Sequence, residues 1–220
     1  MKDLKAIRAS QLLHRLVEAG EHETQDFKFT VNDPRKIARS VSAFANNKGG
    51  HLLIGVDDNG RIRGVRSEED IYVVEAAASI YCVPECKLEF SALKEKGGAT
   101  VIKAEIEPAV RRPVFVKEED NTLHAYFRVK DENISAHPLM LKIWKQKNDD
   151  SSSKFFEMEK AHTLVLNALT ECPRTTDFLY KILNLSRRKI DEIIVSLVLM
   201  DLIEFVYTNK AFHLQLKEEV

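Results

Sequence analysis

With 220 residues, 44% of them hydrophobic and 30% charged, the chain has the composition of a soluble globular protein and enough length for one large domain or two small ones. Its formal net charge of −1 means that any contact with nucleic acid must come from local patches of positive charge. It contains no apolar run near the roughly 20 residues of a membrane span, and its first ten residues are too charged for a secretory signal. We therefore expect a cytoplasmic protein without a membrane partner, whose odd set of cysteines, Cys82, Cys86 and Cys172, consists of reduced thiols.

The chain begins with the pattern of a helix followed by a strand. Residues 4–19 carry apolar side chains at helical spacing, with Leu12 and its neighbours expected to face inward. From Asp26 onward, phenylalanines alternate with polar residues, which predicts a half-buried strand. The period of two places Asp26 and Lys28 on the face opposite Phe27.

Residues 33–47 are predicted to form a second helix. Asp33 is a suitable N-cap, and Pro34 suits the first helical position, where its missing N–H costs nothing. Gly49 and Gly50 follow this helix.

A strand and a turn come next. Residues 52–56 are an apolar run of strand length, and Asp-Asp-Asn-Gly at 57–60 has the composition of a tight turn. The simplest interpretation is a hairpin whose second strand is 61–65.

The rest of the first domain alternates helices and strands. Residues 67–80 are predicted to form a helix capped by Ser67, and 135–147 a helix that closes the domain. Strands are expected at 87–92, 100–106, 114–117 and 123–129. We place this domain at residues 1–147 and a polar linker at 148–154.

The last segment, residues 155–220, has the element order of a winged helix-turn-helix domain. Helices are expected at 156–169, after Thr175 or Thr176, and after Ser186, followed by strands at 203–207 and 211–216. The overall fold class is therefore α+β, with an N-terminal α/β domain and a C-terminal winged-helix domain.

The third helix of this segment begins with three cations. Positive charge at a helix N-terminus is unfavourable, so an external anion such as a DNA phosphate is expected to compensate it. The alternative is a solvated basic corner used for protein contacts. A second apolar strip on this helix, which includes Val195 and Leu202, suggests self-association as a homodimer. The candidate nucleic-acid-binding residues are Arg187, Arg188, Lys189, Thr175, Thr176 and Lys210.

The first domain offers acidic and basic candidates. Glu21, Asp26 and either Asp57 or Asp58 could hold Mg²⁺ or Mn²⁺ for phosphodiester cleavage, with Lys28 stabilising developing charge. The alternative is structural, with the aspartates serving the turn and Asp26 pairing with Lys28. A phosphate-binding surface could include Arg35, Lys36, Arg39, Arg61, Arg63 and Arg128.

Three stretches together resemble the Schlafen AlbA-like domain. They are Glu21-x4-Asp26-Phe27-Lys28, the Ser-Ala-Phe-Ala-Asn-Asn-Lys-Gly-Gly segment at 42–50, and Leu-Ile-Gly-Val-Asp-Asp-Asn-Gly at 53–60; Phe127-Arg128-Val129 followed by Asn133 adds to them. The resemblance covers about residues 10–147 and implies a nucleic-acid-associated α/β domain of the kind found in bacterial transcriptional regulators.

The resemblance also bears on catalysis. Bacterial members of the family are sometimes labelled ATP-binding, but no Walker loop is present and Gly49-Gly50 precedes a strand. Animal Schlafen nucleases cut RNA with a divalent metal, and the matching acids here are Glu21, Asp26 and Asp57 or Asp58. Asp26 stands where the family usually has Glu, and its shorter side chain draws the carboxylate back toward the backbone.

These observations favour a nucleic-acid-binding protein, with a DNA-binding transcriptional regulator as the leading hypothesis and DNA as its partner. The first alternative is a metal-dependent endoribonuclease acting on RNA. The second is a protein-binding adaptor.

Overall fold

The computed structural model describes residues 7–8, 10–65, 67, 69–149 and 158–217. The chain divides into two compact units, residues 1–136 and 137–220, and each is described by itself. Most of the expected linker, residues 150–154, lies outside the described residues. In the described part of the chain, no helix has the length and apolar character needed to cross a membrane.

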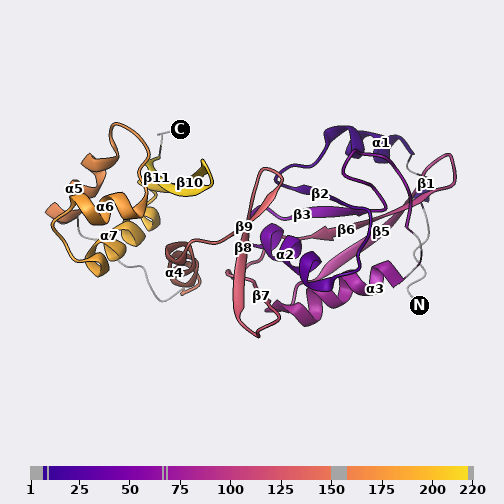
Figure 1. Ribbon diagram of the computed structural model, residues 1–220, viewed down its shortest axis with the longest axis horizontal. Coiled ribbons are helices and arrows are strands. Elements are labelled where there is room, and N and C mark those ends of the chain that lie inside the picture. The colour runs from indigo at the N-terminus through magenta and orange to yellow at the C-terminus, as the bar shows by residue number, and fades with distance from the viewer. Residues whose placement is uncertain (1–6, 9, 66, 68, 150–157, 218–220) are drawn as a thin grey trace. The chain divides into compact units, whose positions relative to one another are not determined.

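Five of the described strands form the main sheet of the first unit (Figure 1). The order in the sheet is β1-β5-β6-β3-β2; β1–β5 and β2–β3 are parallel, and the other pairs are antiparallel. The strands are β1 (Ile7–Arg8), β2 (Gln25–Lys28), β3 (Gly50–Ile54), β5 (Leu88–Lys94) and β6 (Thr100–Ile106).

The helix α2 (Pro34–Ala45) connects the parallel strands β2 and β3. As expected, it begins at Pro34 and is capped by Asp33, whose Oδ1 accepts hydrogen bonds from the N–H groups of Arg35 and Lys36. Parallel neighbours need such a crossover, so this short helix fixes the relative positions of β2 and β3.

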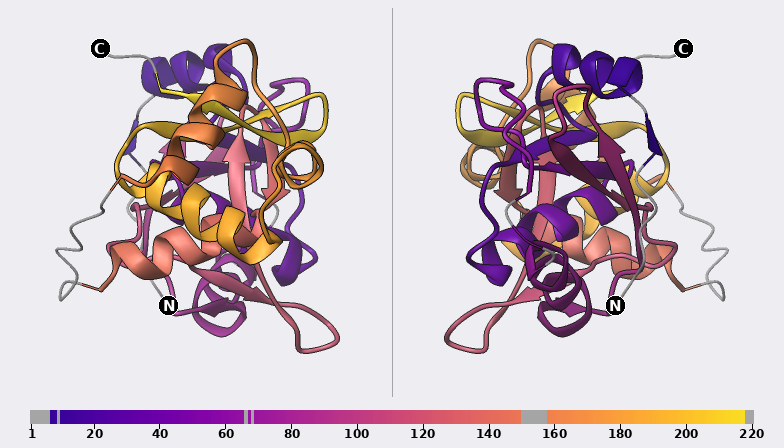
Figure 2. Two further views of the ribbon diagram at one scale, coloured as in Figure 1. Left: turned by 90° about the vertical axis from the view of Figure 1, so that its left-hand side faces the viewer. Right: turned by 90° about the vertical axis from the view of Figure 1, so that its right-hand side faces the viewer.

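The two faces of the main sheet are covered by different helices (Figures 1 and 2). Leu13 of α1 (Ser10–Ala19) packs with Phe27 and Leu53 on one face. Leu52 and Ile54 point to the other face and pack in the core that contains α2. Because both faces are covered, β2 is buried on both sides, and the polar face expected around Asp26 is an interior face.

A second sheet packs on the far side of α2. It has the order β4-β7-β8-β9 in the described chain, with β4 (Cys82–Val83), β7 (Phe115–Lys117), β8 (Leu123–Val129) and β9 (Glu132–Ser135). Asn46 ties it to the helix end, because its Nδ2 donates to the carbonyl oxygens of Val114 (2.8 Å) and Tyr126 (2.9 Å). The strand β9 was not expected from the sequence.

The turn after β3 differs from the predicted hairpin. Residues 61–65 form only an isolated bridge, Val56 to Ile62, while β3 takes β2 and β6 as its partners. The chain instead folds back tightly over Gly55, whose carbonyl accepts from the N–H groups of Arg63 and Gly64. A Cβ at Gly55 would lie 2.7 Å from the carbonyl carbon of Gly64, and its φ of +99° also favours glycine.

Two helices of the first unit differ in extent from the prediction. The helix expected at 4–19 begins at Ser10, because Ile7 and Arg8 pair with β5 as a strand, and Leu12 is 40% exposed instead of facing inward. The helix expected at 67–80 is α3 (Glu69–Ala76), which continues as a π-helical turn, Ala77–Tyr81.

The second unit contains four described helices and one hairpin. The bounds are α4 (Pro138–Lys147), α5 (Lys160–Leu169), α6 (Thr176–Ile182), α7 (Arg187–Leu199), β10 (Ile203–Thr208) and β11 (Ala211–Leu216). The helix α4, which we expected to close the first domain, is grouped with this unit, because Leu139 and Ile143 pack in a core with Ile194 of α7. Arg174 forms a bridge to Leu214 and so adds a third extended segment beside β11.

Candidate functional site

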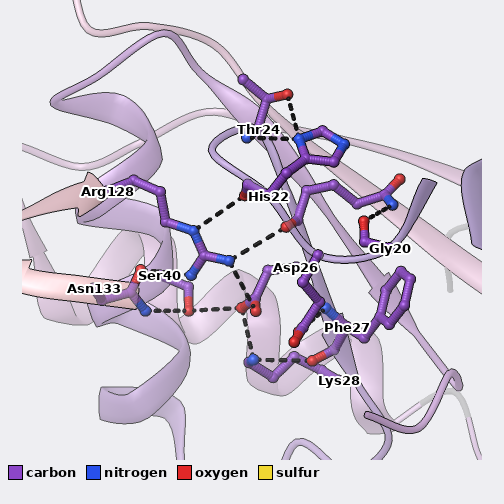
Figure 3. Close-up of polar contacts among 11 residues, drawn as sticks. Gly20, His22, Thr24, Asp26, Phe27, Lys28, Ser40, Arg128 and Asn133 are labelled. Atoms are coloured by element: carbon purple, nitrogen blue, oxygen red, sulfur yellow. Dashed lines mark hydrogen bonds and ion pairs between the residues drawn. The ribbon is translucent and has the colours of Figure 1, made fainter. Parts of the chain in front are cut away.

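Asp26 lies at the centre of a buried polar cluster in the first unit (Figure 3). It projects from β2 toward α2, where Ser40 Oγ donates to its Oδ2 (3.1 Å). The ammonium group of Lys28 lies 2.6 Å from the same oxygen, and Nη2 of Arg128 lies 3.2 Å from Oδ1. The Asp26 carboxylate is therefore held by two cations and a hydroxyl group, with its side chain only 4% exposed.

Arg128 reaches this cluster from β8 of the second sheet. Its guanidinium donates to Asn133 Oδ1 (2.9 Å) and to the carbonyl oxygen of Gln25 (3.2 Å), and it lies over the ring of Phe44. The side chain is 1% exposed. We expected Arg128 on a phosphate-binding surface, and this prediction is wrong because its donors are used inside the fold.

Glu21 and Asp26 form a carboxyl pair at the same place. Glu21 Oε1 accepts from the backbone N–H of Phe27 (2.8 Å). Burial and a hydrogen bond with Asp26 raise the pKa of Glu21. Burial opposes ionisation of Asp26 too, but Lys28, Glu21 and Arg128 outweigh it and lower the pKa of Asp26. A proton shared by this pair therefore resides on Glu21.

The other two acids of the expected metal site lie elsewhere. Asp57 uses Oδ1 to accept from the N–H groups of Asn59 and Arg61, and its Oδ2 lies 3.0 Å from Nε of Arg63. Asp58 is exposed. Among the residues that the structure describes, no group of three or more His, Cys, Asp or Glu side chains could hold a metal ion. Glu21, Asp26 and Asp57 therefore do not form the expected site, and we derive no metal-dependent step.

Most of the remaining cations expected to bind phosphate have partners. Arg39 makes two hydrogen bonds to Glu118 (3.0 and 2.7 Å). Arg63 is engaged by Asp57, and Arg35 lies over the ring of Tyr81. Lys36, Arg61 and Arg63 are the exposed members of this set, and Arg63 is the one of them paired with an acid.

Three adjacent cations of the second unit, Arg187, Arg188 and Lys189, lie at the start of α7. Ser186 caps the helix, and its Oγ accepts from the N–H of Lys189 (3.2 Å). The Lys189 ammonium group pairs with Glu159 (2.8 Å), and this hydrogen bond raises the pKa of Lys189. Lys189 and Arg188 each have an acidic partner within the chain, Glu159 and Glu192, contrary to the expectation that all three cations need an external anion.

Arg187 and Arg188 remain exposed. The Arg188 side chain is 90% exposed and lies 3.0 Å from Glu192, one turn further along α7. The Arg187 guanidinium lies over the ring of Tyr180, 5.3 Å from its centroid. Tyr180 in turn donates to Asp191 Oδ1, and burial with this hydrogen bond raises the pKa of Tyr180 to about 12. Tyr180 thus stays a neutral donor over the whole physiological range.

The other candidate DNA-binding residues of this unit differ in their exposure and local role. Thr175 caps α6 by accepting from Phe178 N–H, and Thr176 is the half-buried first residue of α6. Lys210 is exposed at the tip of the β10–β11 hairpin, with a φ of +59°. The expected self-association strip is interrupted because Val195 is buried in the unit's own core, whereas Leu202 is 39% exposed.

Sequence reasoning missed several residues that organise these sites. Ser40 and Tyr180 carry no distinguishing signal, because a serine and a tyrosine in amphipathic helices are common. Asn133 was named only as part of the family resemblance, and the structure shows that it links Arg128 to Ser40. Glu159 was missed because it lies 30 residues before its partner Lys189.

Comparison with known proteins assigns the first unit to a family. Residues 21–137 match the family model described as Schlafen, AlbA_2, which is more than half of the chain. The chain therefore belongs to the Schlafen AlbA_2 family, and this membership points to a nucleic-acid-related function in general.

Two further comparisons concern whole chains. A crystal structure of the DIP2311 protein from Corynebacterium diphtheriae aligns with 18% sequence identity and a TM-score of 0.42, covering 81% of this chain and 36% of that one. The present chain thus spans only about a third of that protein's length. No curated protein matches the chain.

Proposed function

We propose that the second unit is a winged helix that binds DNA and that the protein acts as a DNA-binding transcriptional regulator. The element order supports this proposal, because three helices, α5 to α7, precede the β10–β11 hairpin. In addition, Arg174 lies between α5 and α6 in the chain and pairs with Leu214 of β11. In helix-turn-helix docking, the N-terminal residues of the recognition helix enter the major groove. By order, α7 is that helix.

The observation that carries the proposal is the exposed positive charge in the first turn of α7. Arg188 is 90% exposed, and its pairing with Glu192 is a surface ion pair of the kind that contributes little to stability. Arg187 is also exposed. The helix dipole disfavours both charges at this end, so a DNA phosphate or a guanine edge would be a better partner than water.

The test compares two double variants of the full chain in DNA-binding titrations followed by fluorescence anisotropy. Arg187→Glu with Arg188→Glu reverses the charges at α7. The matched control is Lys87→Glu with Lys117→Glu, which makes the same change in net charge at two exposed lysines of the first unit. We expect the α7 variant to lose more than tenfold in affinity and the control to lose much less. Equal losses, or no loss at α7, would reject α7 as the DNA-binding element.

The first unit is proposed to support this activity without catalysis. Its acids Glu21 and Asp26 are not needed for a metal in this account, because Asp26 is neutralised by Lys28 and Arg128. Self-association into a homodimer stays a prediction, and sedimentation or light scattering of the purified chain would test it.

A further inference from the structure

Three exposed cations that have no ionic partner among the described residues lie around one hollow of the first unit. Arg15, Lys94 and Lys96 differ in this respect from Arg39, which is paired with an acid, and from Arg128, which is buried in the Asp26 cluster. All three line the same hollow, which has a volume of about 750 Å³. Other unpaired cations of this unit, such as Lys87 and Lys117, do not line this hollow, and the sequence did not indicate that Arg15 meets the two lysines.

The hollow lies between the start of α1 and the turn that joins β5 to β6. Its lining also includes Ser10, Gln11, Leu12, Glu95 and Gly98. The one acid, Glu95, is already engaged: its Oε2 accepts from the N–H of Gly97, and its Oε1 lies 3.8 Å from Nε2 of His14. The three cations therefore outnumber the available negative charge.

The chemistry of this lining suits a nucleotide phosphate. Arg15, Lys94 and Lys96 supply positive charge, and the side chains of Ser10 and Gln11 supply neutral hydrogen-bond donors. Leu12 is 40% exposed and offers an apolar surface for a sugar or base. Small-molecule sites typically have volumes of about 300–1,000 Å³, so the hollow is large enough for a nucleotide unit.

We propose that this hollow binds phosphate groups of a nucleic-acid strand and forms a second contact site, separate from α7. The inference deepens the proposed function, because it rests on nucleic acid being the partner, but it assigns the contact to a different unit. A nucleic-acid strand is favoured over an acidic protein because clustered cations suit successive backbone phosphates and the family of the first unit has a nucleic-acid-related function.

The test uses the full chain and a labelled DNA single strand of about 20 nucleotides, longer than a typical single-strand site. The main variant is Lys94→Glu with Lys96→Glu, and the control is again Lys87→Glu with Lys117→Glu. Arg15→Gln, on a different element, serves as a second variant in case the turn substitutions impair folding, which thermal unfolding would reveal. Each change is made in the parent chain and in the chain carrying Arg187→Glu and Arg188→Glu.

We expect Lys94→Glu with Lys96→Glu to lower strand affinity at least tenfold in both backgrounds and to reduce the salt slope by about 2, because two phosphate contacts are lost. Arg15→Gln should reduce the slope by about 1. A loss no larger than in the control would overturn the inference. The inference would also be overturned if the Lys94→Glu, Lys96→Glu variant lost binding of free ATP but kept the strand affinity of the parent chain. The hollow would then bind a free nucleotide and not a strand.

The two proposals can fail independently. If the α7 variant binds normally and the Lys94/Lys96 variant does not, the winged-helix proposal fails and the hollow stands. If only the α7 variant loses affinity, the hollow is rejected and the proposed function stands.

Discussion

Arg128 and Asp26 form a buried ion pair that joins the two sheets of the first unit. Nη2 of Arg128 lies 3.2 Å from Oδ1 of Asp26, and their side chains are 1% and 4% exposed. One residue comes from β8 and the other from β2, on either side of α2. Each charge is tolerated in the interior because the other neutralises it.

The first prediction concerns the loss of this pair. Asp26→Ala would leave Arg128 buried without its carboxylate, and breaking a buried pair in this way typically costs about 3–5 kcal/mol. Urea unfolding of the first unit should show a decrease in the free energy of unfolding of that order. Asp58→Ala, at an exposed position, should stay within about 0.5 kcal/mol. If the two variants were equally stable, the Arg128–Asp26 pair would not hold the sheets together.

The second prediction concerns pH. The pKa of Glu21 is raised above its ordinary value of 4.5, so the folded state holds this proton more tightly than the unfolded chain. The associated stability is fully present below pH 4.5 and is lost as pH rises through the folded-state pKa. Asp26 acts in the opposite sense: its lowered pKa contributes stability above its ordinary value of 3.8 that is lost on acidification.

Glu21→Gln separates the two effects, because glutamine copies the protonated acid and can still accept from Phe27 N–H. The variant should gain stability relative to the parent as pH rises above 4.5, and the difference should vanish below it. Free energies of unfolding measured across this range would check the trend. A constant difference at every pH would contradict the raised pKa.

The third prediction concerns the orientation of Arg187. Tyr180 supports the Arg187 guanidinium on its ring and is itself anchored through Asp191, whose Oδ2 lies 3.0 Å from the Lys142 ammonium group. Tyr180→Leu removes the ring, so DNA affinity should fall severalfold, because a cation–π contact is worth about 0.5–1 kcal/mol at exposed sites. Tyr180→Phe keeps the ring and should bind nearly as well as the parent. In the Arg187→Ala background, Tyr180→Leu should cause no further loss of DNA affinity. If the two losses were additive, Tyr180 would not act through Arg187.

The fourth prediction ranks two neighbouring cations. Lys189 is paired with Glu159 and its side chain is 38% exposed, whereas the Arg188 side chain, paired with Glu192, is 90% exposed and open to an external partner. Arg188→Gln should therefore weaken DNA binding more than Lys189→Gln does, although both remove one charge. Titrations at one salt concentration would give the ratio, and a larger loss for Lys189→Gln would contradict the assignment.

The elements with strong local signals could be predicted from the sequence. Asp33 and Pro34 define the start of α2, Thr175 and Ser186 cap α6 and α7, and β5 and β6 lie where strands were expected at 87–92 and 100–106. These features depend on residues close together in the chain, so local patterns contain the information.

The features that could not be predicted depend on long-range packing. The period of two correctly placed Asp26 opposite Phe27, but it could not show that α2 covers that face and that Arg128 of β8 reaches Asp26. Arg128 is 102 residues away from Asp26 in the sequence, so local residue spacing could not predict that Arg128 is buried against it. The same limit explains why Lys94 and Lys96 were overlooked: only the fold shows that they meet Arg15 at one hollow.

The most direct test of the central claim is the salt dependence of DNA binding by the parent chain and by the Arg187→Glu, Arg188→Glu variant. If α7 contacts DNA phosphates, the logarithm of the affinity should fall steeply with the logarithm of salt concentration, with a slope reduced by about 2 in the variant. A parent chain whose DNA binding is weak and insensitive to salt, or a variant with an unchanged slope, would contradict the claim that α7 is the DNA-binding element.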